Sequence, residues 1–415
     1  CGSVLTLDLA EGCLELGAEV LQTTAWPLLR SVFGALRPPL VSGISANSFD
    51  AARRKAFSRI ADRSSLMPFD VAIEAGREVS IQHYNPRREL ILTLAPNNTA
   101  FSYLQLRRFD ERLRHSGLRI VFSSGGRLGL VDAAMLTGQL ARAAGMKELN
   151  GALDWSVPRV GHFVRNITIS LPNPILGDES SAFMHMLYAT CDTPARVMQV
   201  QLLALLLDDS FTRGARLRQG LGYVTAATFA RLAPAVCVIR LMVQSARPGA
   251  AHEITSAIQA AMKDFTETLA SASLASLADS LAQALAEPPQ SLAESGTRIA
   301  AEVWAGTHCF ARRSAARAYL RAVTLAENGA KPDTKVRKDL LKLWMHLSAS
   351  PQLEVTVEPL PRLSASQRLA SGITREFQQG LIRSQINEFP TPSQCASTAR
   401  SSSRSSRSIR SSRRK

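Results

Sequence analysis

The sequence has no apolar run long enough to cross a membrane and no closely spaced cysteines. Its most apolar segment, 198–207, falls well short of the ~20 residues that a membrane-spanning helix needs, so it predicts a buried helix. The six cysteines lie far apart and form no C-x-x-C pair, which argues against a zinc ribbon or a dense disulfide framework. This usage favours buried free thiols in a reducing, intracellular compartment, although it does not identify the compartment.

Histidine pairs that could bind a metal are missing as well. The chain has seven histidines, and all of them are widely separated in the sequence. Neither H-x-x-E-H nor H-E-x-x-H occurs, and the pair His252-Glu253 is followed by no second histidine. A catalytic zinc ion needs about three protein ligands, so the sequence predicts no metal site within this chain. No cysteine–histidine pair stands out as a nucleophile either.

The overall composition is that of a globular protein. The chain has 415 residues, of which 46% are hydrophobic and 20% are charged, and this length predicts two to three domains of roughly 100–200 residues each. It begins with Cys1 and turns at once into a predicted strand at 3–9. We therefore expect the chain to continue a longer protein, in which case any targeting peptide lies upstream.

Positive charge is concentrated at the C-terminal end. The formal net charge is +15, and the seven cations from Arg400 onward, among which there is no acid, leave +8 for the rest. Residues 361–415 lose the apolar periodicity, and 391–415 are mostly Ser, Thr and Arg, so this tail is predicted to be disordered. Nucleic-acid binding through the tail is one alternative function, because its cations would attract phosphates, although it has no aromatic residues to stack on bases.

The first predicted unit, 1–150, has strands near its two ends and helices between them. Apolar spacing predicts strands at 3–9 and 118–124 and helices at 24–35, 45–60, 67–82, 101–114 and 131–144. Asn47 is the expected N-cap of the helix at 45–60. Gly125, Gly126 and Gly129 follow the second strand and are interpreted as a turn, because a phosphate-binding loop would need the P-loop lysine or the full G-x-G-x-x-G.

The second predicted unit, 151–360, follows a linker at 146–161 that is rich in Gly and Pro. Its predicted strands are 163–171, 182–190, 222–229, 235–244 and 352–358, with the middle pair expected to form a hairpin. Its predicted helices are 193–207, 251–270, 274–286, 293–304, 311–324 and 334–345. Both units therefore combine strands and helices, and the fold class is α/β.

Several segments of the second unit resemble a known family in sequence and in order. The segment Arg216-Leu-Arg-Gln-Gly-Leu-Gly-Tyr223 is similar to the Leu-Arg-x-x-x-Gln-Leu-Gly-Tyr segment of insulysin/pitrilysin-type metallopeptidases. The neighbouring matches are Glu179-Ser-Ser-Ala-Phe183, Asp208-Asp-Ser-Phe211, Leu241-Met-Val-Gln-Ser-Ala-Arg-Pro248 and Glu287-Pro-Pro-Gln-Ser-Leu-Ala-Glu294. There are departures: Ala215 and Gly220 replace the family's Leu and Gln, and one extra residue lies between Phe211 and Arg216.

This resemblance implies the C-terminal, zinc-free half of such a peptidase. It implies two α/β domains, 1–150 and 151–360, each with a mostly antiparallel sheet covered by helices. In the family, zinc and its H-x-x-E-H motif lie in the other half, so a zinc-bearing N-terminal half or partner subunit is expected. Peptide substrates are expected between the two halves, and this chain alone is expected to be inactive.

The resemblance also assigns roles to two residues. Tyr223 would support the transition state of peptide hydrolysis in the assembled enzyme, and Arg216 and Tyr223 would bind substrate. A phenol can stabilise a developing oxyanion, and a guanidinium offers a fixed fork of donors to carbonyl oxygens. The alternative for each is structural: Tyr223 as a packed strand aromatic and Arg216 as a cation at a helix end. A second reading of the whole chain is a stand-alone, zinc-free scaffold subunit of a processing-peptidase-like complex.

Overall fold

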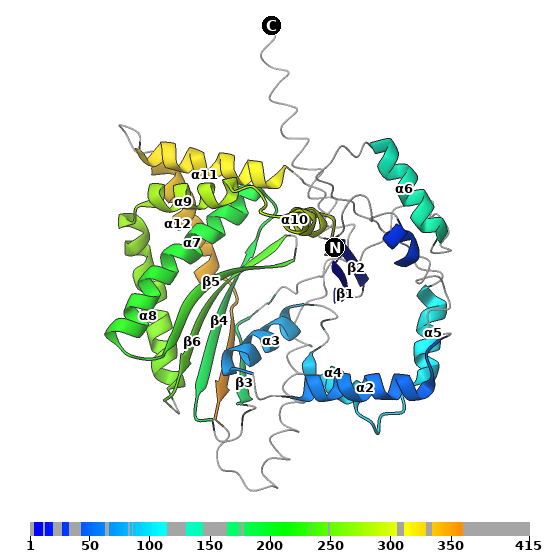
Figure 1. Cartoon of the computed structure of the whole chain (residues 1–415). Helices are drawn as coiled ribbons and strands as arrows, with labels where there is room; N and C mark the ends of the chain where they lie inside the picture. Colours follow the sequence, from blue (N-terminus) through cyan, green and yellow to red (C-terminus); the bar gives the residue numbers. More distant parts are fainter. Residues whose placement is uncertain are drawn as a thin grey trace.

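The structure is a computed structural model of the 415-residue chain (Figure 1). It describes residues 4–10, 13–19, 27–32, 43–62, 66–81, 84, 86–113, 130–143, 163, 165–173, 175, 178–233, 235–247, 250–304, 311–328 and 334–359. The predicted strand at 118–124, the glycine turn after it, the linker at 146–161 and the tail at 361–415 lie outside these residues.

A five-stranded sheet organises the second unit. Its strands, in spatial order, are β3 (Ile167–Pro172), β7 (Leu353–Glu358), β4 (Ser181–Thr190), β6 (Val236–Ser245) and β5 (Val224–Ala233). β3 pairs in parallel with β7, and every other neighbouring pair is antiparallel. β5 and β6 form the predicted hairpin. The predicted fold class, a mostly antiparallel sheet combined with helices, is therefore confirmed.

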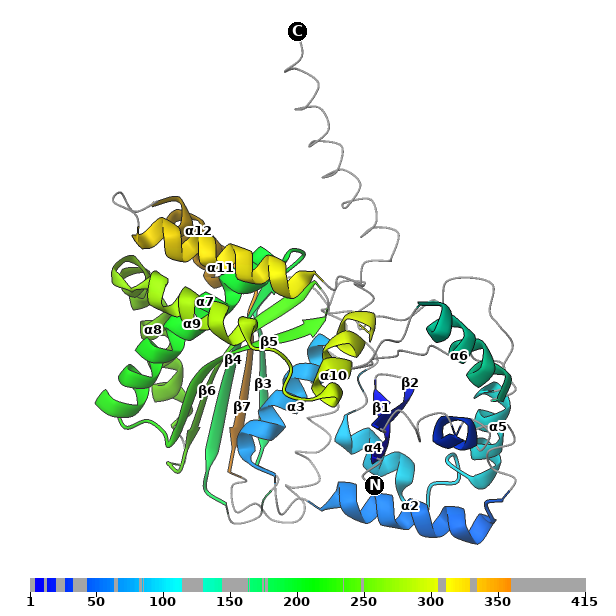
Figure 2. The same cartoon turned by 45° about the horizontal axis from the view of Figure 1, so that its top comes forward.

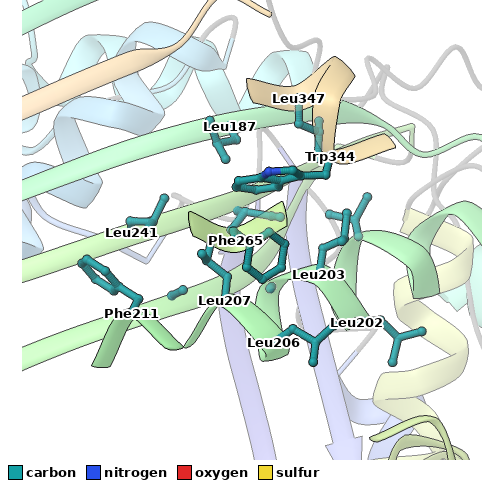
Figure 3. Packing of buried hydrophobic residues seen from close by; sticks show 14 of the residues in the cluster. Leu187, Leu202, Leu203, Leu206, Leu207, Phe211, Leu241, Phe265, Trp344 and Leu347 are labelled. Carbon is teal, nitrogen blue, oxygen red and sulfur yellow. The ribbon is translucent and has the colours of Figure 1, made fainter. Parts of the chain in front are cut away.

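One face of this sheet, here called the helical face, is covered by a layer of helices (Figure 1). The covering helices are α7 (Pro194–Thr212), α8 (Ala251–Ser271), α9 (Leu274–Ala286), α11 (Arg312–Asn328) and α12 (Thr334–Ala349). Their apolar stripes meet Leu187 and Leu241 of the sheet in the larger core. Phe265 and Trp344 pack edge to face at its centre, with ring centroids 4.4 Å apart (Figure 3).

The opposite face, here called the α3 face, receives a helix from far upstream in the sequence. α3 (Pro68–Ser80) packs on it through Ala72, Ala75 and Val79 (Figure 2). A Cβ on Gly76 would lie 2.7 Å from the end of the Met184 side chain, so a larger residue there would require Met184 to shift. The two sequence units are thus joined by a packed contact, because α3 belongs to the first unit and the sheet to the second.

The other described elements of the first unit are a β-hairpin, a short helical segment at 27–32 and four longer helices. The hairpin and the longer helices are β1 (Val4–Ala10), β2 (Cys13–Glu19), α2 (Ala46–Ala61), α4 (Arg87–Leu94), α5 (Tyr103–Leu113) and α6 (Leu130–Ala143). α10 (Leu292–Trp304) belongs to the second unit. The predicted N-cap Asn47 is wrong: Ser45 caps α2 and accepts a hydrogen bond from the Ser48 amide. Strand β2 and helix α4 are absent from the sequence predictions.

Arginine side chains donate hydrogen bonds to the last carbonyls of several helices. Arg337 donates to the carbonyls of Leu269, Ala270 and Ala272, where α8 ends. Arg313 does the same for α9, Arg53 for α4 and Arg87 for α2. The last carbonyls of a helix have no partner within the helix, and cations are favoured there by its dipole. Part of the positive charge of this chain therefore serves the fold.

Candidate functional site

The Arg-to-Tyr segment begins where α7 changes its winding. After Thr212 the helix continues as a π-helix, Arg213–Arg218, in which the Gln219 amide donates to the Gly214 carbonyl at 3.2 Å. A π-turn accommodates one more residue than the same stretch of α-helix and is often found at functional sites. It therefore gives a physical reason for the extra residue between Phe211 and Arg216.

Two glycines then carry the chain from the helix to strand β5. Gly220 has φ of +59°, which a residue with a side chain rarely adopts, so glycine in place of the family's Gln suits the local backbone. A Cβ on Gly222 would lie 2.4 Å from the Gln244 carbonyl oxygen. Between them, buried Leu221 anchors the loop in the larger core. The turn is thus pressed against β6, and the position of the next residue is fixed.

That next residue, Tyr223, is held against Gln244 at two points. Its amide donates to the Gln244 carbonyl at 3.0 Å, and its hydroxyl accepts a hydrogen bond from the Gln244 side-chain amide. Gln244 is 1% exposed, whereas Tyr223 is 48% exposed. The phenol is therefore oriented by a buried amide while the ring stays open to solvent. Gln244 is part of the Gln-Ser-x-x-Pro match in the sequence, and its polar side chain at the end of an apolar strand was the signal for it.

Arg216 lies within the π-helix and is exposed. Its neighbour Arg213 forms an ion pair with Asp209 one turn away, a contact that contributes little because both side chains are largely exposed. No such pair is found for Arg216 among the described residues. The two predicted site residues thus lie at opposite ends of one tight segment.

The helix that precedes this segment also fixes the strand that follows it. The Asp208 carboxylate accepts a hydrogen bond from the Ala227 amide at 2.7 Å, and the Thr212 hydroxyl donates to the Thr225 carbonyl at 3.2 Å. Both backbone groups belong to β5, which lies at the edge of the sheet. Asp208, the first residue of the acidic pair before Phe211, therefore has a structural role, because its hydrogen bond holds the end of α7 at the edge of the sheet.

A second pair of titratable groups lies on the helical face. Nδ1 of buried His185 is 3.2 Å from the Glu354 carboxylate on the neighbouring strand, at ion-pair distance but without the alignment of a hydrogen bond. The contact with His185 lowers the pKa of Glu354 below its ordinary value, and a hydrogen bond from Thr168 acts in the same direction. Within the described residues, no three His, Cys, Asp or Glu side chains are grouped as a metal site would require.

No helix in the described part of the chain combines the length and the apolar character that crossing a membrane requires.

Comparison with known proteins gives one family match. Residues 202–300 match the family described as "PQQ synthase PqqF-like, C-terminal lobe domain 4". This region contains the π-helix, the two glycines and Tyr223. A search of curated proteins finds no match.

Solved structures give similar folds over most of the chain. Pitrilysin is similar over 88% of this chain and 36% of its own, with a TM-score of 0.67 and 14% identity. The peptidase M16 inactive domain from Pseudomonas fluorescens is similar over 87% of this chain and 82% of its own, with a TM-score of 0.56 and 13% identity. The periplasmic protease PqqL from Escherichia coli is similar over 86% of this chain and 37% of its own, with a TM-score of 0.58 and 10% identity.

The chain therefore spans only about a third of pitrilysin, and its fold is that of pitrilysin-type domains. Together with the match to a C-terminal lobe domain, this confirms the resemblance to the C-terminal half of a pitrilysin-type peptidase.

Proposed function

We propose that this chain, with the fold of the C-terminal half of a pitrilysin-type peptidase, is the substrate-holding and zinc-free part of a metalloendopeptidase. The observation that carries the proposal is the geometry of Tyr223. Its ring is exposed while its hydroxyl is held by buried Gln244, which is the arrangement expected of a side chain that presents a polar group to a ligand. A tyrosine that only packed the hairpin would be buried.

The chemistry of the segment suits peptide hydrolysis. A phenol held at one place can donate a hydrogen bond to the oxygen that becomes negative when a peptide carbonyl is attacked. Arg216 offers several donors in a fixed plane to substrate carbonyl oxygens. Neither group activates water, so this segment would assist a reaction whose catalytic metal is held elsewhere.

Zinc is assigned to a complementary half or partner subunit. Peptidases of this family are generally zinc-dependent and work as paired halves or subunits. The sequence lacks H-x-x-E-H, and the described residues offer no cluster of three ligands, so they do not fit the ion. The ion would supply the activated water and polarise the scissile carbonyl.

The test is Tyr223→Phe in the enzyme assembled with its zinc-bearing half. Loss of one oxyanion donor should lower kcat by about 10²-fold, with a smaller change in KM. Tyr319→Phe is the matched control, because Tyr319 is a partly buried tyrosine that packs on the core of the helical face. Equal kcat values for wild type and Tyr223→Phe would contradict the role of Tyr223.

A second candidate is a zinc-free scaffold subunit. It is favoured by the similarity to the M16 inactive domain, because this chain covers 82% of that protein but only 36% of pitrilysin. The two candidates differ in what the chain adds to a zinc-bearing subunit. If the chain is half of the catalytic chamber, the wild type should raise the peptidase activity of the zinc-bearing subunit more than Tyr223→Phe does. If the chain is a scaffold, both should raise that activity equally.

A further inference from the structure

One charged side chain on the α3 face has a buried donor for which the described residues supply no acceptor. Arg240 lies in the middle of β6, within the otherwise apolar run Val236–Met242. It is half-buried, and its Nε is shielded from solvent without a hydrogen-bond acceptor among the described residues. Burying a guanidinium donor without an acceptor costs free energy. Within the described residues, the Arg240 guanidinium therefore destabilises the fold without a compensating contact.

The surroundings of Arg240 increase this cost. Arg77 of α3 is close enough to repel it, and burial together with Arg77 lowers the pKa of Arg240 below its ordinary range. Tyr188, the other group that acts on it, uses its hydroxyl to bond Ser80. No carboxylate of the described part of the chain pairs with Arg240. Among the described residues, two cations therefore adjoin one patch of the α3 face, and no carboxylate is paired with Arg240.

The strand register relates this patch to Tyr223. Arg240 and Gln244 are both on β6, and because side chains alternate between faces, residues four apart share a face about 14 Å apart. Gln244 holds the Tyr223 hydroxyl, so Tyr223 and Arg240 mark two ends of one line along the sheet. The neighbouring β5 contributes Ala226 and Thr228, which are small and partly exposed, so these side chains project little from the sheet beside this line.

We propose that Arg240 binds the carboxylate of an acidic side chain of the peptide substrate, about four residues from the position that Tyr223 engages. This inference rests on the proposed function, since it concerns the same substrate. A carboxylate supplies the missing acceptor, and the guanidinium fork binds it in two-pronged geometry. The site would thus select acidic peptides.

The first experiment measures binding to the full chain. An unstructured ten-residue alanine–serine peptide with one central glutamate is compared with the same peptide containing glutamine. A charge-assisted hydrogen bond should make the glutamate peptide bind about tenfold more tightly. Arg240→Gln should abolish this preference, and Arg240→Lys should keep part of it. Arg247→Gln, which removes an exposed arginine paired with Glu253, should leave the preference unchanged.

NMR can monitor the Arg240 side chain in the wild-type protein while a peptide binds. In arginine-labelled protein, the Nε–Hε NMR signal of Arg240 should shift with the glutamate peptide and stay in place with the glutamine peptide. If both peptides bind and the signal moves with neither, the carboxylate site is wrong while the peptide-holding function stands. If neither peptide binds, the proposed function fails and this inference fails with it. A shift with inorganic phosphate but not with the glutamate peptide would overturn the choice of a carboxylate.

Thermal stability separates a binding role from a structural one. If Arg240 is kept for a ligand, Arg240→Met removes a buried unpaired charge and should raise the melting temperature of the ligand-free chain by about 2 °C. A structural arginine behaves in the opposite way, as Arg337 should, because its guanidinium closes the end of α8. A fall in melting temperature for Arg240→Met would contradict the inference.

Discussion

The two faces of the five-stranded sheet treat polar side chains differently. On the helical face His185 lies 3.2 Å from a carboxylate, and its two ring nitrogens and the Thr225 hydroxyl have no hydrogen-bond partner among the described residues. Apolar side chains from five helices fill the remaining space. On the α3 face, Arg240 lacks a partner within the described residues, Gln244 has a buried side-chain oxygen without a donor, and Tyr223 is open to solvent. Polar groups without partners thus occur on both faces, but helices bury those of the helical face, whereas Arg240 and Tyr223 remain partly exposed, where a ligand could reach them.

The largest expected effect tests the helical face. Trp344→Ala should lower the free energy of unfolding by about 3–5 kcal/mol, because it opens a cavity where Phe265 and Trp344 pack. Denaturant unfolding measures the change. The adjacent Met345 is 63% exposed while Trp344 is 1% exposed, so Met345→Ala is a matched control that should cost little. Similar losses for the two variants would mean that the helical face does not dominate stability.

An intermediate effect is expected where the Arg-to-Tyr segment meets β6. Gly222→Ala places a Cβ against the Gln244 carbonyl, and overpacking of this kind costs about 1–3 kcal/mol. It should also displace Tyr223 and weaken peptide binding. Gly214→Ala is the control, because a Cβ there meets nothing within 4 Å. If Gly222→Ala leaves both unfolding and binding unchanged, the tight contact at β6 does not position Tyr223.

The smallest effect concerns the ion pair on the helical face. Contact with His185 depresses the pKa of Glu354, so the carboxylate contributes stability above the pKa it has in the unfolded chain. That contribution is lost as pH falls through the lower folded-state pKa. The difference in unfolding free energy between wild type and Glu354→Gln should therefore shrink between about pH 6 and pH 3. A difference that stays constant across this range would contradict the lowered pKa of Glu354.

Periodicity predicted the elements of the second unit well. The helices at 251–270 and 274–286 and the strand at 182–190 agree with α8, α9 and β4 to within about one residue. These segments carry apolar side chains at the spacing of their own structure, so local pattern and tertiary environment agree. In the first unit β2 and α4 were missed, although Leu14, Leu16 and Ala18 alternate along Cys13–Glu19 as they do in a strand.

Long-range features could not be predicted from periodicity. Nothing near Gly76 in the sequence indicates that it faces Met184, more than a hundred positions away. The candidate site was partly predictable: the family resemblance selected Arg216 and Tyr223, and Gln244 lay within a quoted match. Arg240 was missed, although a single charge within the apolar strand VCVIRLMVQS was the signal for it.

The hydrogen bonds between α7 and β5 affect how this protein can associate with other chains. Edge strands are templates on which foreign strands can add, which leads to unwanted association. Because Asp208 and Thr212 already bond the outward amide of Ala227 and the outward carbonyl of Thr225, these two groups in the first half of the edge cannot pair with another strand. These bonds therefore oppose self-association by strand addition beside the segment that carries Tyr223.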